Sequence, residues 1–409
     1  MSAVRYITTP IYYLNGAPHL GHVYTTIAAD VLARYWRLAG AQVKFLTGTD
    51  EHGQKVAQAA EASGETPQAF TDHMSSLFLE MTKKINSSHD VFLRTTEERH
   101  HIAAQALWKK LEDAGQIYEG TYAGWYAVRD EAYVDASEIK DGKAPSGAPV
   151  EWVEETSHFF RLSQWERPLL DYYEAHPDAI APIGRRNEVL SFIKGGLRDL
   201  SISRTKFTWG VAVPGSSEHV MYVWIDALTN YLTALGYPDT DCDDFKTFWP
   251  ESIHLLGKDI LRFHAVYWPA FLMAAGLAPP KRLFAHGWLV HDGEKMSKSL
   301  GNVVDPFQLM ETYGVDAVRY FLMREVPFGQ DGSYSEAALV QRLNSDLAND
   351  LGNLAQRVLS FVYKNAEGKI PESHELSTED QEMLAKASHL HDLLRQDMES
   401  QALHTYCAH

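Results

Sequence analysis

Two histidines and a glycine stand close together near the start of the chain, where an extended run gives way to a helical pattern. His19, Gly21 and His22 occur in the order His-x-Gly-His. Helical residues three positions apart share a face, so both imidazoles should point the same way. The glycine lets a ligand approach the backbone, and a helix N-terminus adds amide donors and partial positive charge. The pattern predicts a polyphosphate or nucleotide site.

A second motif combines two cations with small residues in a polar loop. Lys295 and Lys298 belong to the run Lys-Met-Ser-Lys-Ser, which is followed by Gly301 and Asn302. Two lysines at this spacing can form a mobile cationic clamp for phosphate groups. The sequence contains neither a P-loop nor a Gly-x-Gly-x-x-Gly turn after a strand. We therefore assign phosphate binding to these two motifs.

Together and in this order, the two motifs resemble the signatures of the class I aminoacyl-tRNA synthetases. Four further stretches resemble the methionyl-tRNA synthetases: residues 15–22, 48–53 (Gly-Thr-Asp-Glu-His-Gly), 222–227 (Tyr-Val-Trp-Ile-Asp-Ala) and 257–259 (Gly-Lys-Asp). The resemblance covers the chain from Tyr6 to about Leu403. It implies a ligase that activates methionine with Mg²⁺-bound ATP, releases pyrophosphate, and transfers methionine to the 3′ end of its tRNA for protein synthesis.

The resemblance also implies roles for individual residues. The catalytic groups would be His19, His22, Lys295 and Lys298. ATP would be bound by His19, Gly21, His22, Gly257, Lys258, Asp259, Lys295 and Lys298. Methionine would be bound by Ile11, Tyr13, Asp50, Trp224, Ala227, Leu228, Tyr231 and His264. Within that set Asp50 would hold the substrate ammonium group, with Arg204 as its basic partner.

The composition of this methionine pocket suits a thioether. A thioether has no strong hydrogen-bonding group, so recognition must come from shape, burial and contact between sulfur and aromatic rings. Tyr13, Trp224 and Tyr231 would supply aromatic walls. Family members often have proline at the position of Leu228, which makes that contact the least typical one.

The chain departs from many family members in its inserted domain. Those members carry a zinc knuckle built on pairs of cysteines, whereas residues 125–131 read Trp-Tyr-Ala-Val-Arg-Asp-Glu here. The chain has two cysteines in all, Cys242 and Cys407. We therefore expect no structural zinc and no protein-bound metal, and we expect apolar packing to hold the insert together.

The elements that must position these residues alternate between strand and helix. A strand at Val4–Thr8, a helix over 19–40 and a strand at 43–46 predict a parallel βαβ unit. Further strands are predicted at 220–225, 253–256 and 283–286. The sequence thus predicts an α/β fold: a Rossmann-like parallel-sheet catalytic domain with an inserted β-rich subdomain, followed by a C-terminal α-helical, partial bundle.

Changes in composition divide the chain into four segments. Residues 1–114 and 220–334 are the two halves of the catalytic domain, the second with the Lys-Met-Ser-Lys-Ser loop. Residues 115–219, rich in aromatics and glycines, are the inserted connective subdomain. Residues 335–409 are expected to form a partial anticodon-binding domain with one helix on each side of Pro371.

The helical end of the chain carries a matching pair of tRNA contacts. Asn353 and Arg357 match the family's anticodon-binding residues, although the region from Glu336 onward has six basic and twelve acidic residues. The family's helical domain has more helices than fit here. We therefore expect a truncated form with exposed apolar faces on both helices. We also expect a monomer.

Composition limits the remaining possibilities. The 409 residues are 45% hydrophobic and carry a net charge of -17, which argues against disorder and against general coating of nucleic acid by positive charge. Selective binding of one tRNA is compatible with this charge. No signal peptide and no membrane-spanning run is recognisable. We expect a cytoplasmic protein that does not associate with membranes.

Two alternatives remain at this point. A cofactor adenylyltransferase can also carry His-x-Gly-His, but such enzymes are usually much shorter and lack the inserted and helical domains. A non-enzymic tRNA-binding relative of the synthetases is the other, although its phosphate motifs would not be expected to stay intact. Identifying the small molecule that releases pyrophosphate from ATP distinguishes these possibilities.

Overall fold

The protein is described from a computed structural model that places residues 3–14, 16–127, 132–134, 136–291, 294–295, 304–370, 372 and 375–409. The chain forms two compact units. The first unit holds residues 1–18, 29–83 and 87–285, and the second holds 19–28, 84–86 and 286–409.

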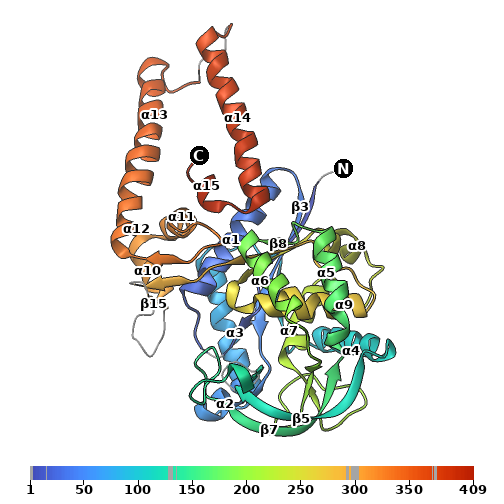
Figure 1. Cartoon of the computed structure of the whole chain (residues 1–409). Helices are drawn as coiled ribbons and strands as arrows, with labels where there is room; N and C mark the ends of the chain where they lie inside the picture. Colours follow the sequence, from blue (N-terminus) through green and yellow to red (C-terminus); the bar gives the residue numbers. More distant parts are fainter. Residues whose placement is uncertain are drawn as a thin grey trace. The chain divides into compact units, whose positions relative to one another are not determined.

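A seven-stranded sheet is the centre of the first unit (Figure 1). Its order is β2-β3-β1-β12-β13-β8, and β4 pairs with β3. The strands are β1 (Val4–Thr8), β2 (Tyr12–Tyr13), β3 (Gln42–Asp50), β4 (Val91–Arg94), β8 (Ile180–Ala181), β12 (Ser252–Gly257) and β13 (Arg282–His286). The pairs β1–β3, β1–β12, β2–β3, β3–β4 and β8–β13 are parallel. The predicted parallel α/β core is confirmed.

The predicted βαβ unit is also confirmed. Helix α1 (Leu20–Leu38) connects β1 to β3, whose register sets Val4 beside Gln42. Further helices of this unit are α2 (Gln54–Ser63), α3 (Pro67–Lys84), α4 (Glu98–Asp113), α8 (Asp243–Phe248) and α9 (Trp268–Ala274). The core joins Trp108 of α4, Trp268 and Phe271 of α9, and Tyr231.

One predicted strand is wrong. Residues 220–225 were expected to be extended, but the strand β11 (Val220–Met221) ends early and pairs with β10 (Ser203–Arg204) outside the main sheet. Helix α7 (Val223–Thr233) begins directly after it. Every residue of α7 except Trp224 is buried. A helix that is buried on all sides shows no 3.6-residue hydrophobic period, so the apolar run resembled a buried strand.

The segment predicted as an inserted β-rich subdomain contains a four-stranded antiparallel sheet. Its order is β6-β5-β7-β9, with β5 (Ile117–Ala127) and β7 (Glu151–Phe160) as the long central pair, flanked by β6 (Ala132–Val134) and β9 (Leu200–Ser201). Two helices, α5 (Glu166–Ala175) and α6 (Ile183–Lys194), lie in the same stretch and were not predicted. Strand β8 between them joins the main parallel sheet.

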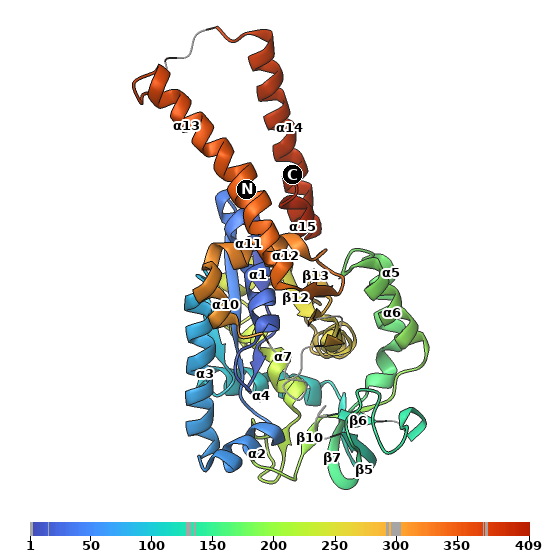
Figure 2. The ribbon, with the colours of Figure 1, turned by 90° about the vertical axis from the view of Figure 1, so that its left-hand side faces the viewer.

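The second unit is mainly helical (Figure 2). It contains α10 (Pro306–Tyr313), α11 (Val315–Glu325), α12 (Glu336–Arg342), a π-helical segment (Leu343–Gly352), α13 (Asn353–Asn365), α14 (Thr378–Ser400) and α15 (Leu403–Tyr406). A small sheet in the order β15-β14-β16 joins Glu294–Lys295, Leu289–His291 and Gly332–Tyr334. The predicted helices before and after position 371 are confirmed, and α15 adds a short helix at the end that was not predicted.

Large apolar side chains stand exposed on the two long helices of this unit. On α13 Leu359 is 69% exposed and Phe361 68%, and on α14 Met383 is 72% exposed. The expected apolar faces on both helices are therefore confirmed. Among the described residues of α14, the one that is fully buried is Met398, which lies in the last turns of the helix.

Candidate functional site

Strands β2 and β3 bring the first predicted methionine-binding residues together. Their parallel register sets Tyr13 beside Asp50, and the Leu14 amide donates to the Asp50 carbonyl at 3.2 Å. Asp50 is the last residue of β3 and is buried, as is Ile11. Ligands of parallel sheets bind at the carboxyl ends of the strands, where this carboxylate lies. Sequence position alone does not set Tyr13 against Asp50; the strand pairing does.

Helix α7 contributes the next four predicted residues on one face. Trp224, Ala227, Leu228 and Tyr231 follow the spacing i, i+3, i+4, i+7. The last three are buried and Trp224 is half-buried. The indole of Trp224 stacks on Phe263 with ring centroids 3.7 Å apart and planes 5° apart. Phe263 was missed from the sequence, although an aromatic residue directly before His264 was an available signal.

Tyr231 and His264 form a buried, neutral pair. His264 Nδ1 donates to the Ile260 carbonyl (3.0 Å), so its Nε2 accepts a hydrogen bond from the Tyr231 hydroxyl at 2.8 Å. Burial lowers the pKa of His264 to about 4, so the imidazole is uncharged at neutral pH. A pocket with neutral polar groups and aromatic rings can hold an uncharged thioether without the cost of a buried charge.

A second histidine supports Tyr231 from behind and was also missed. His254 of β12 stacks on the Tyr231 ring at 4.0 Å, and its Nδ1 lies 2.8 Å from the Thr8 hydroxyl on β1. Burial lowers the pKa of His254 well below its ordinary value. The parallel pairing of β1 with β12 places Thr8 opposite His254. The sheet therefore fixes the ring that would contact the substrate.

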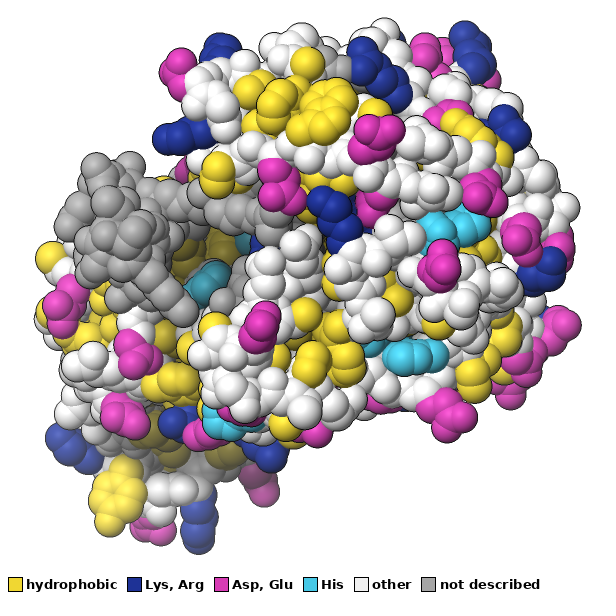
Figure 3. Space-filling view, turned by 90° about the horizontal axis from the view of Figure 1, so that it is seen from below, with side chains coloured by type: hydrophobic (Ala, Val, Ile, Leu, Met, Phe, Trp, Pro, Cys, Tyr) yellow, Lys and Arg dark blue, Asp and Glu magenta, His cyan; other side chains and the backbone are white. Residues whose placement is uncertain are grey.

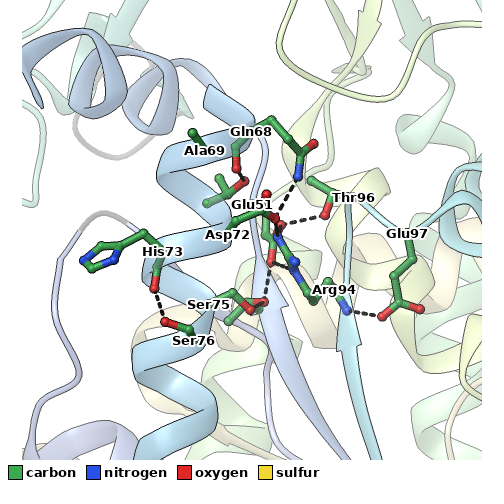
Figure 4. Close-up of polar contacts among 12 residues, drawn as sticks. Glu51, Gln68, Ala69, Asp72, His73, Ser75, Ser76, Arg94, Thr96 and Glu97 are labelled. Atoms are coloured by element: carbon green, nitrogen blue, oxygen red, sulfur yellow. Dashed lines mark hydrogen bonds and ion pairs between the residues drawn. The ribbon is translucent and has the colours of Figure 1, made fainter. Parts of the chain in front are cut away.

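The chain just after Asp50 is held by a partly buried ion pair (Figure 4). The Glu51 carboxylate accepts from Arg94 Nε at 2.7 Å and Nη2 at 2.9 Å, and from the hydroxyls of Thr49 and Thr96, both at 2.7 Å. Arg94 also binds Asp72 of α3 at 2.6 Å. Hydrogen bonding to Glu51 raises the pKa of Arg94 well above its ordinary value. A bidentate pair of this kind fixes direction as well as position.

Arg204, predicted as the basic partner of Asp50, is buried in β10. Its guanidinium donates to the Ser203 carbonyl at 2.7 Å and to the Ser201 hydroxyl at 3.0 Å. It also lies over the ring of Tyr222, 4.5 Å from the centroid. The interaction of Arg204 with Asp50 stays a prediction.

The histidine motif lies in the second unit, at the start of α1. The rings of His19 and His22 stack with centroids 3.7 Å apart, so the expected common face is observed. The Gly21 amide donates to His19 Nδ1 at 3.1 Å, and the His19 amide donates to His22 Nδ1 at 3.2 Å. Each neutral imidazole therefore carries its proton on Nε2, the tautomer that can donate to a phosphate oxygen. Burial and His19 lower the pKa of His22.

The small size of Gly21 leaves room for the His19 ring. A Cβ at this position would lie 2.9 Å from Cε1 of His19. One turn further on, the Thr25 hydroxyl lies 3.1 Å from the Gly21 carbonyl and 2.8 Å from Nε2 of His286. His286 Nδ1 lies 2.8 Å from the carbonyl of Gly287. These contacts tie the histidine motif to the segment that leads into β14.

The other predicted ATP and tRNA residues are placed only in part. Gly257 ends β12, and Lys258 and Asp259 follow in a short 3₁₀ turn at the carboxyl edge of the main sheet. Lys295 lies in β15 opposite Val290, while Lys298 lies outside the described residues. Asn353 and Arg357 are exposed one turn apart on α13.

The described part of the chain lacks two features, a metal-binding cluster and a membrane-spanning helix. Among the residues that the structure places, no three or more His, Cys, Asp or Glu side chains are arranged to hold a metal ion. Within those same residues, no helix is both long and apolar enough to cross a bilayer. Residues 128–131 of the stretch compared with the zinc knuckle lie outside the described residues.

Comparison with known proteins identifies the family. The family model for class I tRNA synthetases (M) matches residues 5–148 and 135–359. The methionine–tRNA ligase of Brucella suis biovar 1 is 59% identical over 404 residues, which cover 98% of this chain and 78% of the relative. The chain belongs to the methionine–tRNA ligase family. The ligase of Rickettsia felis is 59% identical over 372 residues, 91% of this chain and 72% of the relative.

Solved methionyl-tRNA synthetases share the fold. A structure from Mycobacterium tuberculosis in complex with methionyl-adenylate has a TM-score of 0.96 and 55% identity, and the match covers 99% of this chain and 81% of that one. The free form of the synthetase from the same organism gives a TM-score of 0.87 at 51% identity, with 99% and 78% covered. Membership of the methionine–tRNA ligases makes the chain a class I aminoacyl-tRNA synthetase.

Proposed function

We propose that the pocket made by β2, β3, α7 and the π-helical segment Phe263–Tyr267 binds the methionine substrate of this ligase. The observation that carries the proposal is the buried, neutral pair of Tyr231 and His264 on the same helix face as Trp224. The chain is a methionine–tRNA ligase: it activates methionine with ATP and transfers it to tRNA. Asp50 would bind the substrate ammonium group by charge, and Arg204 would orient that acid.

The first step needs alignment and charge stabilisation, and no enzymic base. The methionine carboxylate is already ionised at neutral pH and attacks the α-phosphorus of ATP, which expels pyrophosphate. Negative charge then grows on the phosphate oxygens. His19, His22, Lys295 and Lys298 are the donors and cations that would stabilise it, and Gly21, Gly257, Lys258 and Asp259 would complete the ATP site. ATP would enter as its Mg²⁺ complex.

The second step joins methionine to the tRNA. A terminal ribose hydroxyl attacks the carbonyl of methionyl-adenylate and releases AMP. Figure 3 shows acidic and basic side chains interspersed over one face of the protein. Binding of the tRNA would therefore depend on a few individual side chains and not on the overall charge. Asn353 and Arg357 would contact the anticodon, since both are exposed on one side of α13. We also propose that the enzyme works in the cytoplasm as a monomer without structural zinc.

Amino-acid-dependent ATP–pyrophosphate exchange tests this proposal. Methionine, leucine, isoleucine, valine and cysteine are compared side by side without tRNA, and methionine alone should support rapid exchange. Lys298→Ala should lower the rate about a hundredfold, which corresponds to roughly 3 kcal/mol of transition-state stabilisation. Lys369→Ala, at an exposed position on the loop after α13, serves as the matched control.

Two results would contradict the assignment. Near-normal exchange in Lys298→Ala would remove that lysine from the catalytic set. A folded wild-type protein that shows no exchange with any of the amino acids would favour the non-enzymic tRNA-binding alternative. The adenylyltransferase alternative does not account for matches to methionine–tRNA ligases over 98% of the chain.

A further inference from the structure

A buried carboxylate on α7 joins two histidines from different elements. Asp226 Oδ2 accepts a hydrogen bond from His52 Nδ1, and Oδ1 accepts one from His100 Nε2, both at 2.7 Å. Asp226 and His100 are fully buried, and His52 is 3% exposed. The far nitrogen of His100 lies 3.0 Å from the Thr233 hydroxyl, also on α7. The cluster therefore clamps α7 to both the end of β3 and α4.

The two hydrogen bonds compensate the buried charge. Burial by itself would raise the pKa of Asp226, but the two imidazoles outweigh it and hold the pKa below its ordinary value. A fully buried carboxylate is tolerated only where each oxygen is satisfied in this way. Removing one partner would leave a polar atom unsatisfied, so the geometry of the cluster is strongly enforced.

The cluster lies directly behind the proposed methionine pocket. Asp226 follows Trp224 by two residues and precedes Ala227, but it points from the opposite face of α7, the face of Thr229 and Thr233. His52 follows Asp50 by two residues at the end of β3. The cluster thus joins the strand end that carries the ammonium-binding acid to the helix that carries the side-chain pocket.

The Glu51 carboxylate holds the chain after β3 in a different way from His52. It binds Thr49 on β3, Arg94 on β4, and Thr96 just after β4. Glu51 therefore fixes the strand end within its own sheet. His52 connects this end to α7 through Asp226, and Trp209 lies beside it with ring centroids 5.4 Å apart.

We propose that Asp226 is a positioning residue that, through His52, sets the separation between the Asp50 carboxylate and the pocket face of α7. This separation must match the distance from the ammonium group of methionine to its thioether. The inference rests on the proposed function, because it assumes that Asp50 binds the ammonium group. Asp226 does not touch the substrate; it acts by holding two elements in register.

The test compares two ligands that differ only in the ammonium group. Binding of L-methionine and of 4-(methylsulfanyl)butanoate to the full chain is measured by calorimetry. Asp226→Asn keeps the shape of the side chain but removes the charge and offers one acceptor oxygen in place of two, so one imidazole N–H loses its carboxylate acceptor. In this variant the ratio of the affinity for methionine to the affinity for the des-amino acid should fall about tenfold. The KM for ATP in pyrophosphate exchange should change less than twofold.

Two further variants serve as controls. Asp30→Asn removes a carboxylate oxygen from another fully buried aspartate, which accepts from the Ser88 amide and from Arg34. It should weaken folding without changing the ligand preference. Asp50→Asn should abolish the preference directly. If the wild-type protein shows no preference for methionine, or if Asp50→Asn keeps that preference, Asp50 does not bind the ammonium group. The inference then fails together with the proposed function.

The inference is overturned separately if wild type and Asp50→Asn behave as expected but Asp226→Asn keeps the full preference for methionine. Should Asp226→Asn not fold, His52→Phe decides the matter. Phenylalanine fills the space of the imidazole without its N–H donor, and it leaves the Asp226–His100 contact in place. An unchanged ligand preference in His52→Phe overturns the inference, and a loss of about tenfold supports it.

Discussion

At the scale of single residues, the proposed pocket relies on side chains that burial keeps uncharged. His264 has its Nδ1 proton committed to a backbone carbonyl and its Nε2 committed to Tyr231. A protonated His264 would need a second acceptor where a hydroxyl proton now lies. The pocket is therefore sensitive to pH through stability as well as through binding.

We expect the free energy of unfolding to fall as pH drops from about 6.5 to about 4. The pKa of His264 is about 4 in the folded protein and 6.5 ordinarily, so in this window the unfolded chain binds a proton that the folded protein does not. The stabilisation is present above pH 6.5 and amounts to about 3 kcal/mol for this group. Urea unfolding of wild type and His264→Gln over this range measures it.

The variant should show a shallower fall than wild type, because glutamine does not titrate. His73→Gln is the matched control, since His73 is exposed on α3 and should leave the pH dependence unchanged. Parallel curves for wild type and His264→Gln would contradict the assignment of this proton linkage to His264.

At the scale of elements, β3 and β4 approach so closely that one position requires glycine. A Cβ at Gly48 would lie 1.9 Å from the carbonyl oxygen of Leu93 on β4. Gly48→Ala should therefore separate the two strands and cost about 3 kcal/mol of stability. Thermal and urea unfolding measure the loss. Gly184→Ala on α6, where a Cβ meets open space, should be neutral or stabilise the protein by about 0.5 kcal/mol.

Helix α14 depends on its first turn. The Ser377 hydroxyl accepts from the Asp380 amide at 3.2 Å, and the Asp380 carboxylate accepts from the Ser377 amide at 3.0 Å. Ser377→Ala should cost about 1 kcal/mol, seen as faster amide exchange in the first turns of α14. Ser388→Ala in the middle of the same helix should instead stabilise the helix by about 0.4 kcal/mol. Equal effects from both variants would exclude a capping role.

At the scale of the whole molecule, exposed apolar area on α13 and α14 is the feature with the clearest consequence. Leu359 on α13 is 69% exposed. Leu359→Glu should lower the fluorescence of a bound hydrophobic dye while changing the free energy of unfolding by less than about 0.5 kcal/mol. Gln356→Glu adds the same charge without removing apolar area. A loss of dye fluorescence in that control would assign the effect to charge.

The sequence by itself determined the elements whose pattern is local. The strands at Val4–Thr8 and 253–256, the first helix and the helices around position 371 follow from periodicity and from glycine and proline positions. The same holds for the His-x-Gly-His turn, because two histidines three residues apart on a helix must share a face. Resemblance to the methionyl-tRNA synthetases supplied the substrate and the candidate residues of its pocket.

Tertiary structure decided what depends on burial and on pairing between distant segments. The start of helix α7 was mistaken for the end of a strand because the helix is buried on nearly every side, and a helix without an exposed face leaves no periodic pattern in the sequence. Phe263, His254 and the cluster of His52, Asp226 and His100 have ordinary local sequence patterns. They become recognisable only when strand register and helix packing bring residues 174 positions apart within 2.7 Å of each other. Hydrogen bonding acts over such distances in space, and the sequence order of the partners does not constrain it.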